Sequence, residues 1–145
     1  MTAASGDRLI LHASCVAVGQ RGLLILGPSG SGKSGLALQM MALGAALIAD
    51  DRVAVTREDG LLVARCPVPG IRGRIEARGL GILATPAEDA ATLALAIDLG
   101  QTETDRLPPR RVITLLGMAL DLVHGSQGSH LPAALLCYLR GGRVG

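Results

Sequence analysis

A glycine-rich segment, residues 27–34, constrains the fold of this chain more than any other part of its sequence. It has the order Gly27-Pro28-Ser29-Gly30-Ser31-Gly32-Lys33-Ser34, which fits the pattern of a glycine, four further residues and Gly-Lys-Ser. Glycines in this pattern let backbone N–H groups turn inward around phosphate oxygens, and a following helix adds its positive dipole end. The lysine then reaches the β and γ phosphates, and the serine hydroxyl binds Mg²⁺. The eight residues therefore predict a site for a nucleoside triphosphate.

Apolar runs on both sides of this loop indicate the elements that hold it. Residues 14–18 and 23–26 predict two strands around a turn. Apolar residues recur at helical spacing over residues 34–43, and Gly44 stands where that helix would end. Residues 45–49 are too few for a helix and predict a buried strand. A strand, a phosphate loop and a helix in this order are typical of an α/β fold of the P-loop class, here with a mixed β-sheet.

The rest of the chain is compatible with one domain over residues 1–145. Its core is expected over about residues 8–120, and a C-terminal helix over about residues 131–140. Further strands are predicted in four places, the first two of which form a hairpin: residues 53–56, 61–66, 94–99 and 112–116. Residues 67–81 are rich in proline and glycine and predict an irregular functional loop, while the first dozen residues are expected to be mobile.

The composition argues against several classes of partner. Tyr138 is the one aromatic residue, so the chain has no stacking platform for nucleic-acid bases. The net charge of +2 is spread along the chain without a basic run, which gives no attraction to nucleic acid or to a membrane surface. The longest apolar stretch, residues 35–49, is shorter than the ~20 residues that a bilayer span needs.

The use of single residue types is also informative. Cys15, Cys66 and Cys137 are odd in number and widely spaced, which predicts three free thiols in a reducing cytoplasm, each more consistent with burial than with catalysis. Lys33 is the single lysine of a chain with 13 arginines. A lysine at this one position is expected if the branched guanidinium group of arginine is too bulky for the loop. The chain has no asparagine, which excludes the Asn-Lys-x-Asp element of guanine-specific GTPases and the metal-binding asparagine of eukaryotic-type protein kinases.

Acidic residues follow the strand predicted after the phosphate loop. If that strand returns beside the loop, its carboxyl end brings Asp50 and Asp51 to the γ phosphate. Phosphoryl transfer needs a carboxylate there, either for the metal or for the attacking hydroxyl. The alternative is an Asp-Asp-Arg turn that is merely solvated. His12 reaches the same place if its strand lies next to the one that enters the loop; otherwise it is a surface histidine.

Two further segments carry candidate residues. Glu76 offers a carboxylate for a hard cation and Arg78 a guanidinium for phosphate, in a segment made flexible by Gly79 and Gly81. Arg106 is a candidate for stabilising charge on the transferred phosphoryl group, although arginines more often lie on solvated surfaces. On the residues alone, the segment of Glu76 is equally compatible with a structural role, whereas a solvated surface position is favoured for Arg106.

Several motifs in one order carry a family resemblance over roughly residues 12–107. They are His12, the loop at residues 27–34, Leu47-Ile48-Ala49-Asp50-Asp51-Arg52-Val53, Ile75-Glu76-Ala77-Arg78-Gly79-Leu80-Gly81-Ile82, and the shorter Asp105-Arg106-Leu107. The chain resembles the catalytic domain of HPr kinase/phosphorylase, which phosphorylates a serine of the phosphocarrier protein HPr of the phosphotransferase system. The resemblance implies the fold shared by HPr kinase and PEP carboxykinase.

The resemblance also implies roles for individual residues. Asp51 would take the proton of the seryl hydroxyl, with His12, Lys33 and Arg106 as its catalytic companions. Ser34 and Glu76 would hold Mg²⁺ while ATP is bound, and residues 75–84 would form the signature loop of the family. Asp50, Arg78, Gly79 and Gly81 would support the site.

Departures from the family pattern define further expectations. The catalytic region starts within a dozen residues of Met1, so we expect the short form without an N-terminal domain; whether the chain forms a homo-oligomer is left open. A Pro-Val-Arg-Pro-Gly-Arg segment, tied to dephosphorylation, is replaced by residues 120–128, which predicts a kinase with little or no phosphorylase activity. We expect HPr to dock on apolar residues of the C-terminal helix, Leu135 and Leu136.

Two other functions are compatible with the same loop. A small-molecule kinase would use it for a metabolite hydroxyl, below a lid that bears arginine. A nucleotide-sensing module would bind ATP and signal to a partner without transferring phosphate. Analysis of the reaction products distinguishes both from a protein kinase.

Overall fold

The computed structural model describes residues 2–5 and 8–145, which form an α/β fold around one large mixed sheet. In this part of the chain ten strands form the large sheet and two more form a separate hairpin. The strands are β1 (Thr2–Ser5), β2 (Arg8–Leu11), β3 (Ser14–Val18), β4 (Arg21–Leu26), β5 (Ala46–Ala49), β6 (Val53–Glu58), β7 (Leu61–Arg65), β8 (Arg74–Ala77), β9 (Gly81–Ala84), β10 (Ala91–Thr102), β11 (Arg111–Leu115) and β12 (Met118–Gly125). The helices are α1 (Lys33–Ala42), the short 3-10 helix η1 (Pro69–Ile71) and α2 (Leu131–Gly141).

The order of the strands brings two chain segments to one edge of the sheet. β3 lies between β4 and β5 and pairs antiparallel with both, so β4 and β5 run in the same direction. The phosphate loop leaves the carboxyl end of β4, and Asp50 leaves the carboxyl end of β5. The predicted return of the chain beside the loop is therefore confirmed, with one antiparallel strand in between.

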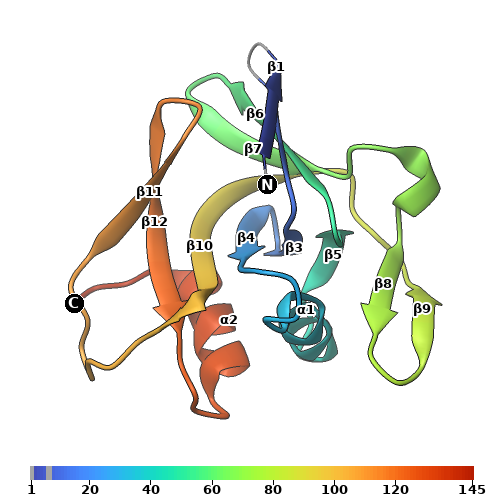
Figure 1. The fold of residues 1–145 in the computed structure, drawn as a ribbon. Helices are drawn as coiled ribbons and strands as arrows, with labels where there is room; N and C mark the ends of the chain where they lie inside the picture. Colours follow the sequence, from blue (N-terminus) through green and yellow to red (C-terminus); the bar gives the residue numbers. More distant parts are fainter. Residues whose placement is uncertain (1, 6–7) are drawn as a thin grey trace.

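The central strands are buried on both faces, which explains why their sequences are apolar without polar alternation. Leu23 and Ile25 of β4 pack with Met40 of α1 and Leu139 of α2. Leu24, between them, points to the opposite face and packs in the second core, which the curled sheet encloses. Figure 1 shows α1 and α2 below β4 and β10, while β6 and β7 lie above them.

The predicted hairpin over residues 53–66 is confirmed as β6 and β7. Asp59 and Gly60 connect the strands with φ angles of 50° and 74°. Positive φ at both central positions is the conformation of a tight type I′ hairpin turn, which Asp-Gly favours.

The prediction of an irregular loop over residues 67–81 is wrong. The segment contains η1 and β8, and β8 pairs antiparallel with β9 in a hairpin of its own. β8 alternates between exposed Arg74 and Glu76 and buried Ile75 and Ala77. A strand of only four residues between glycines carries too short an alternation to be recognised from sequence, and its burial comes from packing against α1.

The prediction of a mobile start to the chain is also wrong for the described residues. Strand β1 pairs with β2, and β2 pairs with β6 over Arg8–Leu11. The partner strand β6 lies more than 40 positions downstream in the sequence, so no local signal reveals this pairing. Neither α1 nor α2 has the length and hydrophobicity that a membrane crossing needs, and the described residues contain no other helix that does.

The three cysteines are free thiols in different environments: Cys15 is buried, Cys66 is half-buried and Cys137 is exposed. The expectation of burial is thus confirmed for Cys15 and wrong for Cys137, which lies on the outer side of α2. Burial raises the pKa of the Cys15 thiol to about 12, because the apolar core disfavours the thiolate.

We expect iodoacetamide at pH 8 to alkylate Cys137 rapidly in the native protein and Cys15 only after unfolding. The reactive species is the thiolate, and Cys15 is both inaccessible and held in the thiol form. Mass spectrometry of peptides alkylated with and without urea measures the two rates. Equal rates in the native protein would contradict the buried position of Cys15.

Candidate active site

The phosphate loop adopts a backbone conformation that requires glycine. Gly27, Gly30 and Gly32 have φ angles of 148°, 83° and 99°. A Cβ atom on Gly27 would lie 2.5 Å from Oγ of Ser31, closer than atoms can approach. Gly32 caps α1, which begins at Lys33 and has no acidic residue in its first turn. The first turn of α1 therefore adds no negative side chain of its own to the loop.

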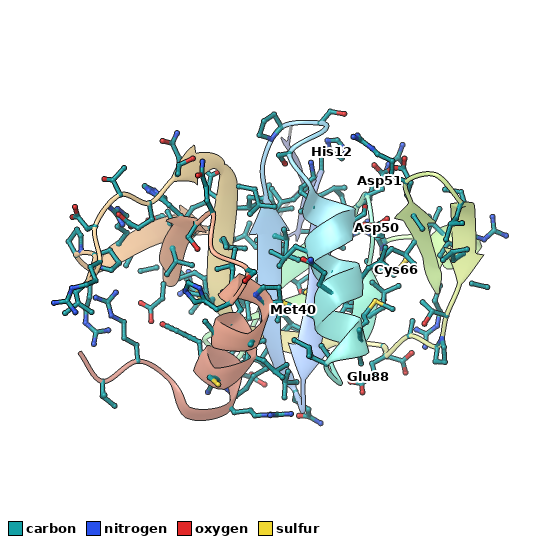
Figure 2. All side chains as sticks on the ribbon, turned by 90° about the horizontal axis from the view of Figure 1, so that it is seen from below. His12, Met40, Asp50, Asp51, Cys66 and Glu88 are labelled. Atoms are coloured by element: carbon teal, nitrogen blue, oxygen red, sulfur yellow. The ribbon has the colours of Figure 1, made fainter. Side chains whose placement is uncertain are left out.

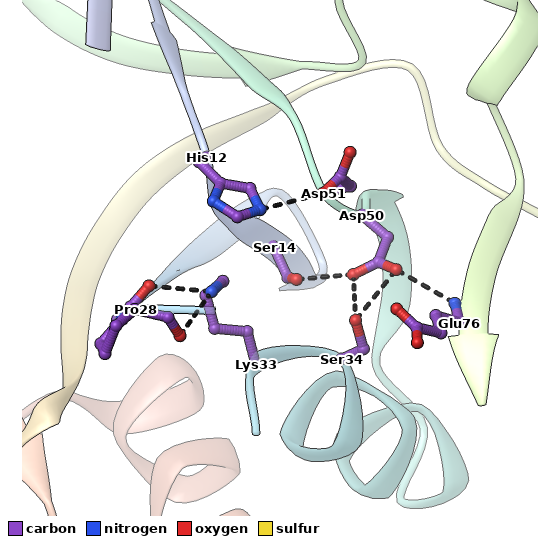
Figure 3. A network of polar contacts seen from close by, with 9 residues as sticks. His12, Ser14, Pro28, Lys33, Ser34, Asp50, Asp51 and Glu76 are labelled. Carbon is purple, nitrogen blue, oxygen red and sulfur yellow. Dashed lines mark hydrogen bonds and ion pairs between the residues drawn. The ribbon is translucent and has the colours of Figure 1, made fainter. Parts of the chain in front are cut away.

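Two polar groups of this loop have unusual surroundings. Lys33 is 8% exposed, and its Nζ donates hydrogen bonds to the carbonyl oxygens of Gly27, at 2.8 Å, and of Pro28, at 3.1 Å (Figure 3). The hydroxyl of Ser31 is buried, and no residue of the described chain bonds to it. A buried hydroxyl without a partner is costly. Ser31 does not line the cavity, however, so the fit of the loop to a phosphate rests on Lys33 and on the start of α1.

Asp50 connects three elements at the edge of the sheet. Its carboxylate is 6% exposed and accepts a hydrogen bond of 2.6 Å from the hydroxyl of Ser14 on β3. It also accepts from the hydroxyl of Ser34 on α1, at 2.8 and 3.0 Å, and from the backbone N–H of Glu76 on β8, at 3.1 Å (Figure 3). The buried charge is thereby fully engaged in hydrogen bonds.

The oxygen atoms around Ser34 fit a magnesium ion that is held jointly with a nucleotide. Within residues 2–5 and 8–145, no three acidic, histidine or cysteine side chains converge as a closed metal site. The Ser34 hydroxyl, the Asp50 carboxylate and Glu76 nevertheless line one cavity. Mg²⁺ usually binds one or two carboxylates together with substrate phosphates and water. This donor set suits that mode of binding.

His12 and Asp51 form a pair at the mouth of the same cavity. His12 Nε2 lies 3.0 Å from Asp51 Oδ1, and the two side chains are 43% and 67% exposed. Asp51 follows β5 and has a φ of 70°, a left-handed conformation that turns its carboxylate out of the sheet edge. His12 is expected from the sequence to reach the site if the strand after it lies next to the strand that enters the phosphate loop. The structure confirms this, because β3 pairs with β4. Both groups can therefore meet an incoming hydroxyl.

The cavity has a volume of about 660 Å³, within the ~300–1,000 Å³ of small-ligand sites. The phosphate loop and the two aspartates form one side, and the hairpin side carries both apolar residues, Ile75 and Ile82, and the charged residues Arg74, Glu76 and Arg78. Its lining residues are His12, Ser14, Ser29, Gly30, Gly32, Lys33, Ser34, Gly35, Leu38, Asp50, Asp51, Ile71, Arg74, Ile75, Glu76, Arg78 and Ile82.

Comparisons with known proteins agree with this geometry. Residues 4–105 match the family model described as "HPr Serine kinase C-terminal domain". The chain belongs to this family. It is 37% identical to the HPr kinase/phosphorylase of Aromatoleum aromaticum, over 72% of this chain and 37% of that protein. The same identity is found with HPr kinase/phosphorylase of Clostridium tetani, over 66% of this chain and 33% of that protein.

The chain thus spans about a third of the length of the curated relatives that it matches. A solved structure, "Structure of the Hpr(Ser) kinase/phosphatase from Coxiella burnetii", superimposes with a TM-score of 0.75 at 23% identity, over 90% of this chain and 88% of that one. This likeness confirms the HPr kinase fold that the sequence motifs imply.

The structure gathers most of the residues that the sequence singled out. His12, Lys33, Ser34, Asp50, Asp51, Glu76 and Arg78 all line the cavity. Gly79 and Gly81 do not: Gly79, with a φ of 89°, lies in the turn between β8 and β9, and Gly81, with a φ of 124°, is the first residue of β9. Arg106 is exposed in the connection between β10 and β11, outside the cavity lining, so its catalytic role stays a prediction.

Sequence reasoning missed some residues of the site and misplaced others. Ser14 has no signal of its own, because a serine at the start of an apolar strand is unremarkable until its partner Asp50 is known. The expected docking residues Leu135 and Leu136 are only 4% and 6% exposed and pack in the core below β4. They cannot contact a partner protein, so that expectation is wrong.

We expect Ser14→Ala to destabilise the domain by about 1–3 kcal/mol, because the buried Asp50 carboxylate loses its shortest hydrogen bond. Urea denaturation measures the free energy of unfolding. Ser129→Ala is the control: Ser129 is exposed in the loop before α2, and its replacement should change stability by less than about 0.5 kcal/mol. Equal effects of the two substitutions would show that Ser14 does not support Asp50.

Proposed function

We propose that this domain is an ATP- and Mg²⁺-dependent kinase that transfers the γ-phosphoryl group to a serine of an HPr-type phosphocarrier protein. The observation that carries the proposal is the pair of His12 and Asp51, 3.0 Å apart, at the mouth of the cavity that also contains Lys33 and Ser34. The names of the relatives, HPr kinase/phosphorylase, support the choice of substrate. The three free thiols are compatible with a reducing cytoplasm.

The phosphate loop would hold the nucleotide. Its inward N–H groups and the start of α1 bind the phosphate oxygens. Lys33 moves its Nζ from the carbonyl oxygens of Gly27 and Pro28 to the β and γ phosphates. The lysine is thus held ready in a buried position before the nucleotide arrives.

The neighbouring oxygens would complete the polar side. When bound, Mg²⁺ offsets the negative charge of the β and γ phosphates. Ser34 and Glu76 are its proposed ligands. Asp50 accepts a hydrogen bond from the Ser34 hydroxyl, which leaves the lone pairs of that oxygen available to a metal. Asp50 also fixes the backbone of Glu76 and so the start of that side chain.

Asp51 would act as the general base. Its carboxylate accepts the proton of the seryl hydroxyl while the seryl oxygen forms a bond to the γ phosphorus. The bond from that phosphorus to the bridging oxygen breaks, and ADP leaves with the electron pair. His12 holds the Asp51 carboxylate in place through Nε2. Most of the acceleration in such reactions comes from positioning and electrostatic stabilisation.

The test is intact-protein mass spectrometry of an HPr-type protein after incubation with this domain, ATP and Mg²⁺. We expect one added phosphoryl group, which is absent when the target serine of HPr is alanine. ATP binding without any phosphorylated product would overturn the proposal and favour a sensing module. Phosphorylation of a small metabolite instead of HPr would favour a small-molecule kinase.

Asp51→Asn tests the proposed base. It should lower turnover by about 10²–10⁴-fold, the usual contribution of a general base, and leave nucleotide binding unchanged. Asp59→Asn is a matched control, because Asp59 is also an exposed aspartate with positive φ but lies in the β6–β7 turn. Asparagine tolerates this backbone conformation, so neither substitution strains the fold. Unchanged turnover in Asp51→Asn would remove Asp51 from its role.

We further propose that phosphorylase activity is weak or absent. The segment that the family uses for dephosphorylation is replaced by residues 120–128, most of which lie in β12, where Leu122–His124 pair with β10. Incubation of serine-phosphorylated HPr with this domain and inorganic phosphate should yield little pyrophosphate. Pyrophosphate formation at a rate that matches the forward reaction would contradict this prediction.

A further inference from the structure

The hairpin of β8 and β9 exposes large apolar side chains beside the candidate active site. Leu80 in its turn is 80% exposed and Ile82 on β9 is 65% exposed. All four residues of β9 are exposed, and within the described residues β9 pairs with no strand other than β8. In Figure 2 the hairpin lies at one end of the molecule, with Asp50 and Asp51 between it and α1. Exposed apolar side chains that cluster beside a site in this way are typical of a surface that binds a ligand or another protein.

The two faces of the hairpin have different surroundings. Ile75 and Ala77 of β8 are buried on one face. Arg74 and Glu76 alternate with them and lie on the other face, because successive side chains of a strand point to opposite sides. Ile82 is the register partner of Glu76, so its side chain lies on the same face, about 5 Å from that of Glu76.

This register connects the apolar surface with the chemistry. Ile82 lines the cavity next to the proposed metal ligand Glu76, whereas Leu80 lies outside the cavity lining. We define the hairpin surface as Leu80 and Ile82 with the adjoining Arg74 and Arg78. An acceptor that reaches Asp51 from this side passes over Ile82, and an acceptor larger than the cavity also covers Leu80.

We propose that the protein acceptor of this domain docks on the hairpin surface, with an apolar side chain of the acceptor on Leu80 and Ile82 and acidic groups near Arg74 and Arg78. This inference rests on the proposed function, because it places the acceptor of that reaction. A metabolite enclosed in the cavity would leave Leu80 bare. A folded protein covers both the cavity mouth and the turn of the hairpin.

The charges of the hairpin favour an acidic partner over a second copy of this chain. Arg72 pairs with Asp89, but in the described chain neither Arg74 nor Arg78 takes part in an ion pair. In a symmetric dimer the same patch faces itself, so the arginines of the two copies would repel each other. A partner with carboxylates opposite Arg74 and Arg78 gains attraction instead, and steering toward the site.

The experiment compares the double variant Leu80→Ser/Ile82→Ser with the unmodified protein. We expect the KM for the folded HPr-type acceptor to rise about tenfold, because two partly buried contacts are lost. The single variant Leu80→Ser, whose side chain lies outside the cavity lining, should raise the KM in the same direction and leave the dissociation constant for a non-hydrolysable ATP analogue, measured by calorimetry, unchanged. Leu61→Ser is the matched control: Leu61 starts β7, is 50% exposed and lies in another hairpin, so its replacement should leave the KM unchanged.

The outcomes separate this inference from the proposed function. Transfer to HPr with an unchanged KM in the double variant overturns the docking surface and leaves the kinase intact. Failure of the unmodified protein both to phosphorylate and to bind HPr, with ATP bound, overturns both. Light scattering measures the molar mass of each protein in solution and so tests whether a second copy occupies the hairpin surface. If the unmodified protein is a dimer and the double variant is a monomer, the proposal is overturned. If both proteins have the same molar mass, the result supports the proposal.

Discussion

The carboxylate of Asp50 is the interaction on which the arrangement of this site depends. It joins β3 through Ser14, α1 through Ser34 and β8 through the N–H of Glu76, while its own side chain is almost completely buried. A buried charge is strongly unfavourable without such partners, so the native arrangement is favoured only when all three elements are in place. The phosphate loop, the sheet edge and the hairpin are therefore coupled through a single side chain.

The strand order makes this coupling possible. Because β3 separates β4 from β5, the phosphate loop and the aspartates leave the same edge of the sheet with the width of one strand between them. Ser14 begins β3 in that space, and His12 stands two residues before it. The three residues from His12 to the start of β3 thus contribute both the hydroxyl that bonds to Asp50 and the imidazole beside Asp51.

The sequence predicts those parts of the site that are local. The glycine pattern of the phosphate loop, the helix after it and the strand that ends at Asp50 are all determined by near neighbours. The contact of His12 with Asp51 joins residues 39 positions apart, so the residues alone predict it only on condition that the two strands are neighbours. The family resemblance is what places His12 in the site without that condition. The hairpin of β8 and β9 escapes prediction because its strands are short and its stability comes from α1. The burial of Leu135 and Leu136 likewise depends on where α2 packs.

The left-handed backbone at Asp51 has a consequence for which residues can serve there. A φ of 70° is readily adopted by glycine, asparagine and aspartate, whose side chains are absent or short, and poorly by longer or branched residues. Of these three, aspartate is the one that ionises. Glutamate, the other acid of proteins, would carry its carboxylate one methylene further out and strain the chain at the same time. Of the two acidic residues, the backbone of the turn after β5 therefore accommodates only aspartate at the point where the proposed proton transfer takes place.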